Sequence, residues 1–415
     1  MKNFIAHTDD IRQEMLNSVN KSSIDDLFKH IPVLFKEFKM DNPLSELETQ
    51  KRIKALSKKN KTDYISFLGG GVYNKFIPAA VNYTAQRFEF LTAYTPYQPE
   101  ISQGTLQVIY EYQTMISRIT GMDIANASMY DGGSACAEAV LMAHRINRGK
   151  LNKALISNKL NPEYKEVIKT YAWAKDIELE WFDELPDNVS DACCVLVQYP
   201  DYYGEIYQLK KPDTTFIVCA NLSALSVINP PTEADIVVGD IQPLGIPMNF
   251  GGPHAGYMAC KEVYMRQLPG RLVGRTLDAD GKQAFTLTIQ TREQHIKREK
   301  ATSNICSNQS LIALSATLYL SLLGEKGFRE TGIISANNAH KLSQMLQEKG
   351  IKTLNKNFFN EFVIEVKDSD MFLNKLKETG ILGGIKLNNK QILVCATEMN
   401  SDEDINAYVE QAGKI

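Results

Sequence analysis

A short segment dense in tyrosine and proline is the first candidate for a binding site. Residues Thr92–Gly104, here called the tyrosine loop, read Thr-Ala-Tyr-Thr-Pro-Tyr-Gln-Pro-Glu-Ile-Ser-Gln-Gly. Because proline fixes φ and removes a backbone donor, this loop is held rigid before anything binds to it. Tyr94, Tyr97, Gln98 and Glu100 are therefore candidate ligand contacts. The alternative is that both tyrosines pack beneath a proline-rich turn.

A second candidate is the turn that opens Met129–Ala139, a segment rich in small residues. The backbone N–H groups at such a helix start, together with the hydroxyl of Ser134, could form a cup for an anion. The alternative is an ordinary helix start with Ser134 as its cap.

Two further loops combine backbone freedom with polar side chains. Asp240–Gly256 is dense in glycine and proline, so its backbone could approach a ligand or a partner chain, or simply return between strands. We expect His254, in this loop, to be structural rather than catalytic. Thr291–Asn308 is a charged run that ends in hydroxyl and amide groups. It is either a solvated face or a segment that closes on an anion, with the candidate residues Lys300, Thr302, Ser303 and Asn304.

The elements that must position these loops follow an α/β pattern between residues 62 and 310. Residues 104–119 carry apolar side chains at helical spacing, and Gly121 follows as a stop. Continuously apolar runs are typical of strands covered on both faces, as in a largely parallel sheet. These runs are Ala154–Ser157, Ile177–Trp181, Cys193–Tyr199, Thr215–Ala220, Asp235–Gly239 and Gly256–Cys260.

The two ends of the chain differ from this central domain. Residues 1–61 predict a helical N-terminal arm, with helices that begin near Ser22 and Pro43 and carry acidic residues in their first turns. Residues 311–415 predict a small α+β domain. Its expected elements are helices at 311–324 and 336–348, strands at 361–366 and 391–396, and a closing helix from Asp402.

Composition argues against nucleic-acid and membrane-surface binding. The 46 basic and 49 acidic residues of this 415-residue chain give a net charge of −3. The first ten residues carry charges where a signal peptide has its apolar core. The longest apolar run, Leu311–Leu323, predicts a buried helix because it is too short to span a bilayer.

Cysteine and histidine usage predicts a cytoplasmic protein without a metal site. The seven cysteines are scattered, odd in number and without a Cys-x-x-Cys pair. Such usage is typical of a reducing compartment. The six histidines are also dispersed, and no Cys/His cluster has the spacing of a metal site.

Four regions together resemble the glycine decarboxylase family, the pyridoxal-phosphate P-proteins of the glycine cleavage system. They are Thr92–Gly104, Thr120–Ser128, Gly245–Pro247 with Phe250–Gly256, and Arg298–Cys306. The resemblance covers nearly the whole chain. In many bacteria the enzyme is split into two homologous subunits, and this chain resembles the N-terminal half, subunit 1. The family implies the fold-type-I architecture of aminotransferases, with a large mostly parallel-sheet domain and a small α+β domain.

The resemblance also identifies two groups that the chemistry needs and this chain lacks. Pyridoxal-phosphate catalysis needs a Schiff-base lysine and a carboxylate for the pyridine nitrogen. Gln242 lies near the expected lysine position, and no lysine occurs from Ala220 to Cys260. Val218 occupies the position that matches the carboxylate. We therefore expect no catalytic residue in this chain, and pyridoxal 5'-phosphate held covalently by the partner subunit.

By the same resemblance, two loops of this chain would complete the partner's site. Loops similar to Ala301–Asn304 in desulfurase-type enzymes hydrogen-bond the cofactor phosphate of the other subunit. Thr302, Ser303 and Asn304 are thus candidates for that role. The tyrosine loop is a candidate for lining the cofactor pocket or its entrance, and Ser134 would mark a vestigial phosphate cup.

The implied function is that of a glycine dehydrogenase subunit, an oxidoreductase of amino-acid catabolism. The assembled enzyme, of expected α2β2 composition, would decarboxylate glycine and pass the aminomethyl group to the lipoyl arm of H-protein. The basic stretch Arg292–Lys300 would either dock this carrier or form a solvated helix. Two alternatives remain: a purely structural partner subunit that contributes no site residues, and a self-sufficient pyridoxal-phosphate lyase.

Overall fold

The structure, a computed structural model, describes residues 7–32, 40–91, 94–305 and 308–415. Residues Met1–Thr62 and Asp63–Ile415 form two compact units, which are described separately. The smaller unit holds helices α1 (Asp9–Ser18), α2 (Ile24–Phe28) and α3 (Glu46–Ser57).

The helix starts of the smaller unit follow from capping chemistry. The side chains of Ser23 and Ser45 cap α2 and α3 and exchange hydrogen bonds with Asp26 and Glu48, respectively. Such capping boxes satisfy backbone donors that the helix itself leaves open. The helices expected to begin near Ser22 and Pro43 are therefore confirmed, with starts two or three residues further along.

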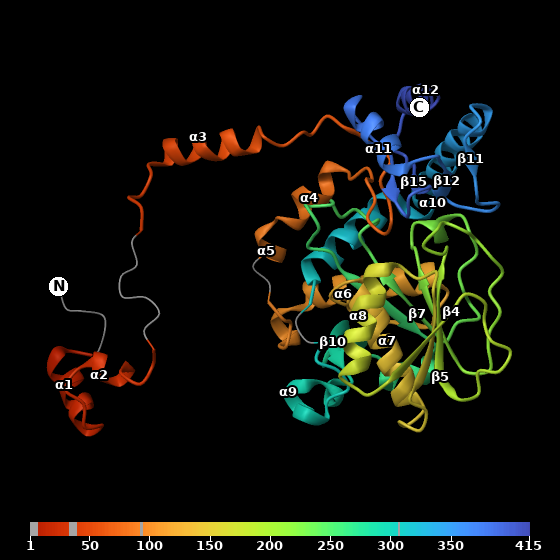
Figure 1. Ribbon diagram of the computed structural model, residues 1–415. Helices are drawn as coiled ribbons and strands as arrows, with labels where there is room; N and C mark the ends of the chain where they lie inside the picture. The colour runs from red at the N-terminus through yellow and green to blue at the C-terminus, as the bar shows by residue number, and fades with distance from the viewer. Residues whose placement is uncertain (1–6, 33–39, 92–93, 306–307) are drawn as a thin grey trace. The chain divides into compact units, whose positions relative to one another are not determined.

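A seven-stranded sheet in the order β2-β8-β7-β6-β5-β3-β4 is the centre of the larger unit (Figure 1). All pairs among β3 to β7 are parallel, whereas β8 pairs antiparallel with β2 and β7. The six apolar runs predicted as strands are confirmed. The strands are β2 (Ile124–Ala125), β3 (Lys153–Ser157), β4 (Glu178–Phe182), β5 (Ala192–Tyr199), β6 (Thr215–Ala220), β7 (Ile236–Asp240) and β8 (Gly256–Cys260).

Helices cover both faces of this sheet, which explains why its strands are continuously apolar. One core contains residues of α6 (Gln103–Thr120) and α10 (Ser310–Glu348), and the other contains residues of α7 (Gly132–Ile146) and α8 (Pro162–Trp173). Along β5 the side chains alternate between the two cores, Val195 and Val197 in the first, Cys194 and Leu196 in the second.

A second lobe of the larger unit is built on the four-stranded antiparallel sheet β11-β12-β15-β14. Its elements are β11 (Lys352–Thr353), β12 (Glu361–Glu365), α11 (Ser369–Glu378), β13 (Ile381–Leu382), β14 (Ile385–Lys386), β15 (Gln391–Cys395) and α12 (Asp402–Ala412). Strand β1 (Ile65–Ser66) pairs with β13, and Phe67 is buried in the core of this lobe. The chain therefore enters the larger unit through its C-terminal lobe.

Helix α10 joins the two lobes. It runs without interruption by a loop, but Gly324 departs from helical geometry at φ 61° and ψ −177°. The second helix, expected near Ala336, therefore begins directly after Gly324. By length and composition α10 is the one described helix that could cross a membrane. Its Tyr319 and Leu320 are buried in the core of the large sheet.

A hairpin that the sequence pattern did not predict precedes the charged run. Strand β9 (Leu272–Leu277) pairs antiparallel with β10 (Gln283–Thr288). The remaining short elements are α4 (Ala79–Ala85), α5 (Phe88–Leu91), η1 (Pro99–Ile101), η2 (Ala224–Ser226), η3 (Glu262–Gln267), η4 (Gln290–Arg292), α9 (Gln294–Lys297) and η5 (Arg298–Lys300).

Candidate functional site

The carboxyl ends of β5, β6 and β7 meet at the edge of the sheet where open α/β folds bind ligands. The cavity there measures only about 40 Å³. This is room for a few water molecules, whereas ligand pockets occupy about 300–1,000 Å³. None of the described residues that line it is a lysine; they are Gly71, Tyr73, Asn161, Tyr164, Gln198, Cys219, Ala220, Asn221, Gly239, Asp240 and Pro243. His254 is half-buried and is not among them.

Gln242 is part of the packing that closes this cleft. Its side chain is 0% exposed. The Oε1 atom accepts a hydrogen bond from the Tyr73 N–H at 2.9 Å. The Nε2 atom donates to the carbonyl oxygens of Tyr73 at 2.9 Å and Ile246 at 2.8 Å. All three partners are backbone groups, so Gln242 holds the segment around Tyr73 in place.

Tyr73 connects the cleft to the C-terminal lobe. Its hydroxyl donates to Glu361 Oε2 at 2.7 Å and accepts from Asn221 Nδ2 at 3.2 Å. The backbone N–H of Gly70 donates to the other oxygen of Glu361 at 2.6 Å. Burial raises the pKa of Glu361 and, together with the Glu361 charge, that of Tyr73. The cleft is thus closed by buried hydrogen bonds between the two lobes.

The helix start predicted as a phosphate cup is occupied by carboxylates of the chain itself. The cap of α7 is Asp131 rather than Ser134, and the two residues exchange hydrogen bonds at 2.7 and 3.1 Å. The N–H of Gly132 donates to Asp240 Oδ2 at 3.1 Å. Burial raises the pKa of Asp240 to about 7. The N–H groups of Gly132 and Ser134 already donate to Asp240 and Asp131, so they are not free to bind a phosphate at this helix start.

Val218 lies within the sheet. On β6 it pairs with Val197 of β5 and Val237 of β7, and its side chain is buried in the core beneath α6 and α10. An apolar side chain there offers no hydrogen bond to a ring nitrogen.

The described part of the tyrosine loop is exposed. Thr92 and Ala93 lie outside the described residues. Tyr94 is 79% and Tyr97 44% exposed, so the alternative that both pack beneath a turn is wrong. Gln98 and Glu100 are exposed as well.

Gln103 anchors the end of this loop. Its Nε2 donates to the carbonyl oxygens of Pro99 and Phe285, both at 2.8 Å. Its Oε1 accepts from the N–H of Phe285 at 2.8 Å. The loop is therefore fastened to strand β10.

The Ala301–Asn304 segment is held by contacts on both sides. The Thr302 N–H donates to the Arg292 carbonyl at 3.0 Å. The Ser303 hydroxyl donates to Glu138 Oε1 at 2.8 Å. Glu138 is 2% exposed, and burial raises its pKa. Asn304 is exposed, and Cys306 lies outside the described residues.

A cavity of about 890 Å³ adjoins this segment. Its lining includes Thr302, Ser303 and Asn304 together with basic side chains of Arg145, Arg148, Lys175 and Arg298.

Arg292 is buried and donates to the Gly270 carbonyl at 2.6 Å. The basic stretch Arg292–Lys300 is therefore not a uniformly solvated helix, and Arg292 is not available to a docking carrier.

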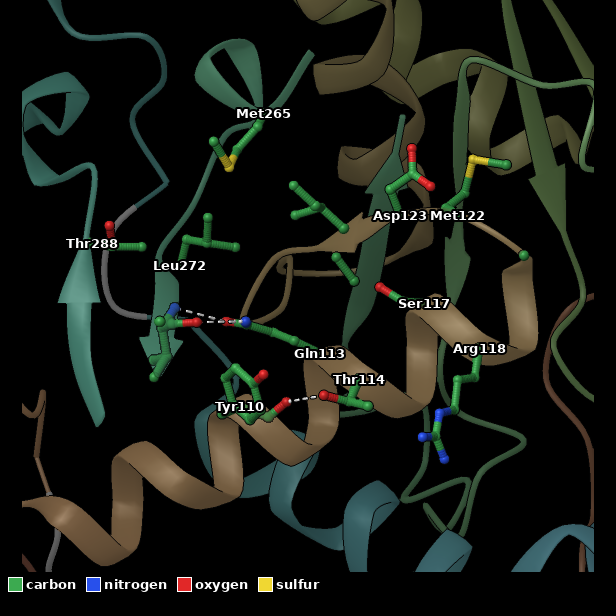
Figure 2. Close-up of a pocket in the computed structure, with 15 residues that line it drawn as sticks. Tyr110, Gln113, Thr114, Ser117, Arg118, Met122, Asp123, Met265, Leu272 and Thr288 are labelled. Atoms are coloured by element: carbon green, nitrogen blue, oxygen red, sulfur yellow. Dashed lines mark hydrogen bonds between the residues drawn. The ribbon is translucent and has the colours of Figure 1, made fainter. Parts of the chain in front are cut away.

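A third cavity, of about 610 Å³, lies between α6 and β9 (Figure 2). The Gln113 side chain spans it and bonds both backbone groups of Val273, at 2.9 and 3.0 Å. None of the candidate site residues lines this cavity.

Among the described residues, no group of His, Cys, Asp or Glu could hold a metal ion.

Comparison with known proteins identifies the family. The profile described as "Glycine cleavage system P-protein" matches residues 2–411.

The chain belongs to this family.

Its relatives include the probable glycine dehydrogenase (decarboxylating) subunit 1 of Geobacillus thermodenitrificans, 45% identical over 99% of this chain and 98% of that protein. The corresponding protein of Anoxybacillus flavithermus is 44% identical over the same shares. A crystal structure of glycine decarboxylase (P-protein) of the glycine cleavage system, in inhibitor-bound form, matches with a TM-score of 0.88 and 40% identity over 99% of both chains.

A more distant likeness concerns the fold alone. Glutamate decarboxylase from Lactobacillus brevis matches with a TM-score of 0.65 at 13% identity, covering 95% of this chain and 96% of that one. The predicted fold-type-I architecture is confirmed.

The cleft of this P-protein-family chain does not fit pyridoxal phosphate. Its lining has no lysine among the described residues, its volume is about 40 Å³, and the α7 start is taken by Asp131 and Asp240.

Sequence reasoning found Gln242 but missed the residues around it, Tyr73 and Glu361. The Gly69-Gly-Gly71 run was an available signal. A Cβ at Gly69 would lie 2.3 Å from Glu361 Oε1, so the backbone passes very close to the C-terminal lobe.

Proposed function

We propose that this chain is subunit 1 of a glycine dehydrogenase (aminomethyl-transferring, decarboxylating) and that its homologous partner subunit holds the pyridoxal phosphate. The assembled enzyme decarboxylates glycine and transfers the aminomethyl group to the lipoyl arm of H-protein. The observation that carries this proposal is the closed cleft, with Gln242 bonded to three backbone groups where the catalytic subunit needs its lysine. We also propose an α2β2 assembly in the cytoplasm. The six described cysteines are all free, as is typical of a reducing compartment.

Cofactor labelling tests this division of labour. The chain alone and the chain assembled with its partner are incubated with pyridoxal phosphate and reduced with borohydride, and the labelled peptides are identified by mass spectrometry. We expect label on a partner lysine only. A stoichiometric label on one lysine of this chain would refute the proposal and favour the self-sufficient lyase.

We further propose that two loops of this chain complete the partner's site. Thr302, Ser303 and Asn304 would bind the cofactor phosphate, while Tyr94, Tyr97, Gln98 and Glu100 would line the pocket. Support comes from the exposure of the tyrosine loop and from the hydrogen bonds of Gln103 and of the Thr302 N–H, which hold both loops before assembly. The Ser303 hydroxyl donates to Glu138 and would have to turn away from it to donate to a phosphate. Preorganised donors act without reorganisation during the reaction.

Substitutions in both loops distinguish this role from that of a purely structural subunit. Tyr97→Phe and Thr302→Ala should each lower kcat/KM for glycine about 10-fold, the effect of losing one hydrogen bond to a charged group, while assembly is retained. Tyr203→Phe, another exposed tyrosine, serves as the control. Unchanged kinetics in both loop variants would favour the structural alternative.

A further inference from the structure

One buried arginine lies between the two candidate loops. Arg271 directly precedes β9 and is 4% exposed. Its carbonyl accepts a hydrogen bond from the Ala127 N–H at 2.9 Å, which fixes its backbone to the segment after β2. A buried guanidinium is costly unless its donors and its charge are matched. Two of the groups around it belong to the candidate loops.

Arg271 contacts the tyrosine loop on one side. Its Nη2 donates to the Tyr97 hydroxyl at 3.1 Å. Its guanidinium carbon also lies 5.3 Å from the centroid of the Tyr97 ring, within range of a cation–π interaction. Tyr97 keeps 44% of its surface exposed, so the arginine supports the inner side of a ring whose outer side is free.

On its other side Arg271 meets the charged run. Its Nε lies 4.0 Å from Glu293 Oε2, and the side chains of both residues are 5% exposed. His295 Nδ1 lies 3.6 Å from the same carboxylate oxygen, and its ring meets the Tyr97 ring edge-on with centroids 5.7 Å apart. Tyr97, Arg271, Glu293 and His295 thus form one cluster that joins segments about two hundred residues apart.

The residue before Arg271 anchors the same run. The Gly270 carbonyl accepts from Arg292 Nη2, and the Arg292 carbonyl accepts from the Thr302 N–H. Gly270 has φ +79°, and a Cβ there would lie 3.1 Å from Asn126 Nδ2. The Gly270–Arg271 step therefore supports both the tyrosine loop and the start of the Thr302 segment.

We propose that Arg271 is a positioning residue that fixes Tyr97 relative to the Thr302 segment, so that the partner meets both loops as one preformed surface. This inference rests on the proposed function of these loops. Arginine suits the role because one nitrogen of its planar fork donates to the Tyr97 hydroxyl while another lies beside the Glu293 carboxylate. Lysine carries all its donors on one nitrogen and has no such fork.

A double-mutant cycle in the assembled enzyme tests the proposal. Arg271→Met, Tyr97→Phe and the double variant are compared by kcat/KM for glycine and by the dissociation constant of pyridoxal phosphate. We expect Arg271→Met to lower kcat/KM about 10- to 100-fold, as a small misplacement of site groups does. Because part of the effect of Arg271 passes through Tyr97, the double variant should lose less than the product of the two single losses. Arg118→Met, an exposed arginine on α6, is the control.

Conservative variants keep the test decisive if Arg271→Met does not assemble. Arg271→Lys should assemble without restoring kcat/KM, and Glu293→Gln should show a smaller loss. Additive effects of Arg271→Met and Tyr97→Phe, or full activity of Arg271→Lys, would overturn the inference while leaving the proposed function intact. No effect of Tyr97→Phe would instead refute the role of Tyr97 and the inference with it.

Discussion

Substituting Gln242 by lysine supplies an amine near the position where, under the proposed function, the partner subunit carries its Schiff-base lysine. We expect Gln242→Lys to bind no cofactor and to destabilise the chain. The side chain is fully buried, and the neighbouring cavity of about 40 Å³ has no room for a pyridine ring.

The destabilisation can be worked from the hydrogen bonds. A charged lysine has no acceptor, so the buried Tyr73 N–H, now 2.9 Å from Gln242 Oε1, loses its partner at a cost of about 1–3 kcal/mol. A neutral lysine could accept that hydrogen bond instead, but keeping it neutral at pH 7 against its usual pKa of about 10.4 costs about 4.6 kcal/mol. Pairing with the nearby Asp240 carboxyl would return part of this. A net loss of about 3–6 kcal/mol is a large share of the 5–15 kcal/mol that stabilises a typical domain.

Two measurements check this prediction. Urea unfolding, followed by the fluorescence of Trp173 and Trp181, gives the change in the free energy of unfolding. Incubation with pyridoxal phosphate, borohydride reduction and mass spectrometry show whether residue 242 is labelled. The same substitution on the surface, Gln344→Lys, should change stability by less than about 0.5 kcal/mol. A Gln242→Lys variant as stable as the parent, with label at residue 242, would refute the reasoning.

Two further predictions concern buried charges. Lys75→Met removes the ammonium that lies 2.5 Å from Glu398 Oε2 and should lower the free energy of unfolding, measured in urea, by about 3–5 kcal/mol. Adding Glu398→Gln should recover part of this loss, because it removes the buried charge left without its partner. No recovery in the double variant would count against a charge effect. Burial raises the pKa of Asp240 to about 7, so the native state binds a proton that the unfolded state releases between about pH 4 and 7. Stability should therefore fall as pH rises through this range, by up to about 1.4 kcal/mol per pH unit. Asp240→Asn should flatten that slope in unfolding measured from pH 4 to 8, and an unchanged slope would exclude Asp240 as its source.

The central sheet could be predicted because its strands are covered on both faces. Runs such as Cys193–Tyr199 and Thr215–Ala220 are apolar at every position, and the structure buries them between two helical layers. The β9–β10 hairpin was missed for the opposite reason. Its strands turn polar or exposed away from their buried ends, as Arg275 to Leu277 show, so they lack a continuous apolar signal.

The candidate loops were found from sequence as segments, but the contacts that hold them were not. Tyr97 and Ser303 stood out because rigid or hydroxyl-rich loops are chemically distinctive. Their supports are single charged residues. Arg271 directly precedes strand β9, and Glu138 lies within helix α7. Nothing local distinguishes a charged side chain that faces solvent from one that is buried beneath a loop.

What the sequence determined by itself is which chemical groups the chain lacks. A lysine missing between Ala220 and Cys260 is missing in every conformation, so the proposal that this chain holds no covalent cofactor needed no coordinates. What fills the cleft beside Gln242 was decided only by the tertiary structure. The cleft is closed by Tyr73 and Glu361, which lie 288 positions apart, and a hydrogen bond of 2.7 Å between them exists only once both lobes are packed.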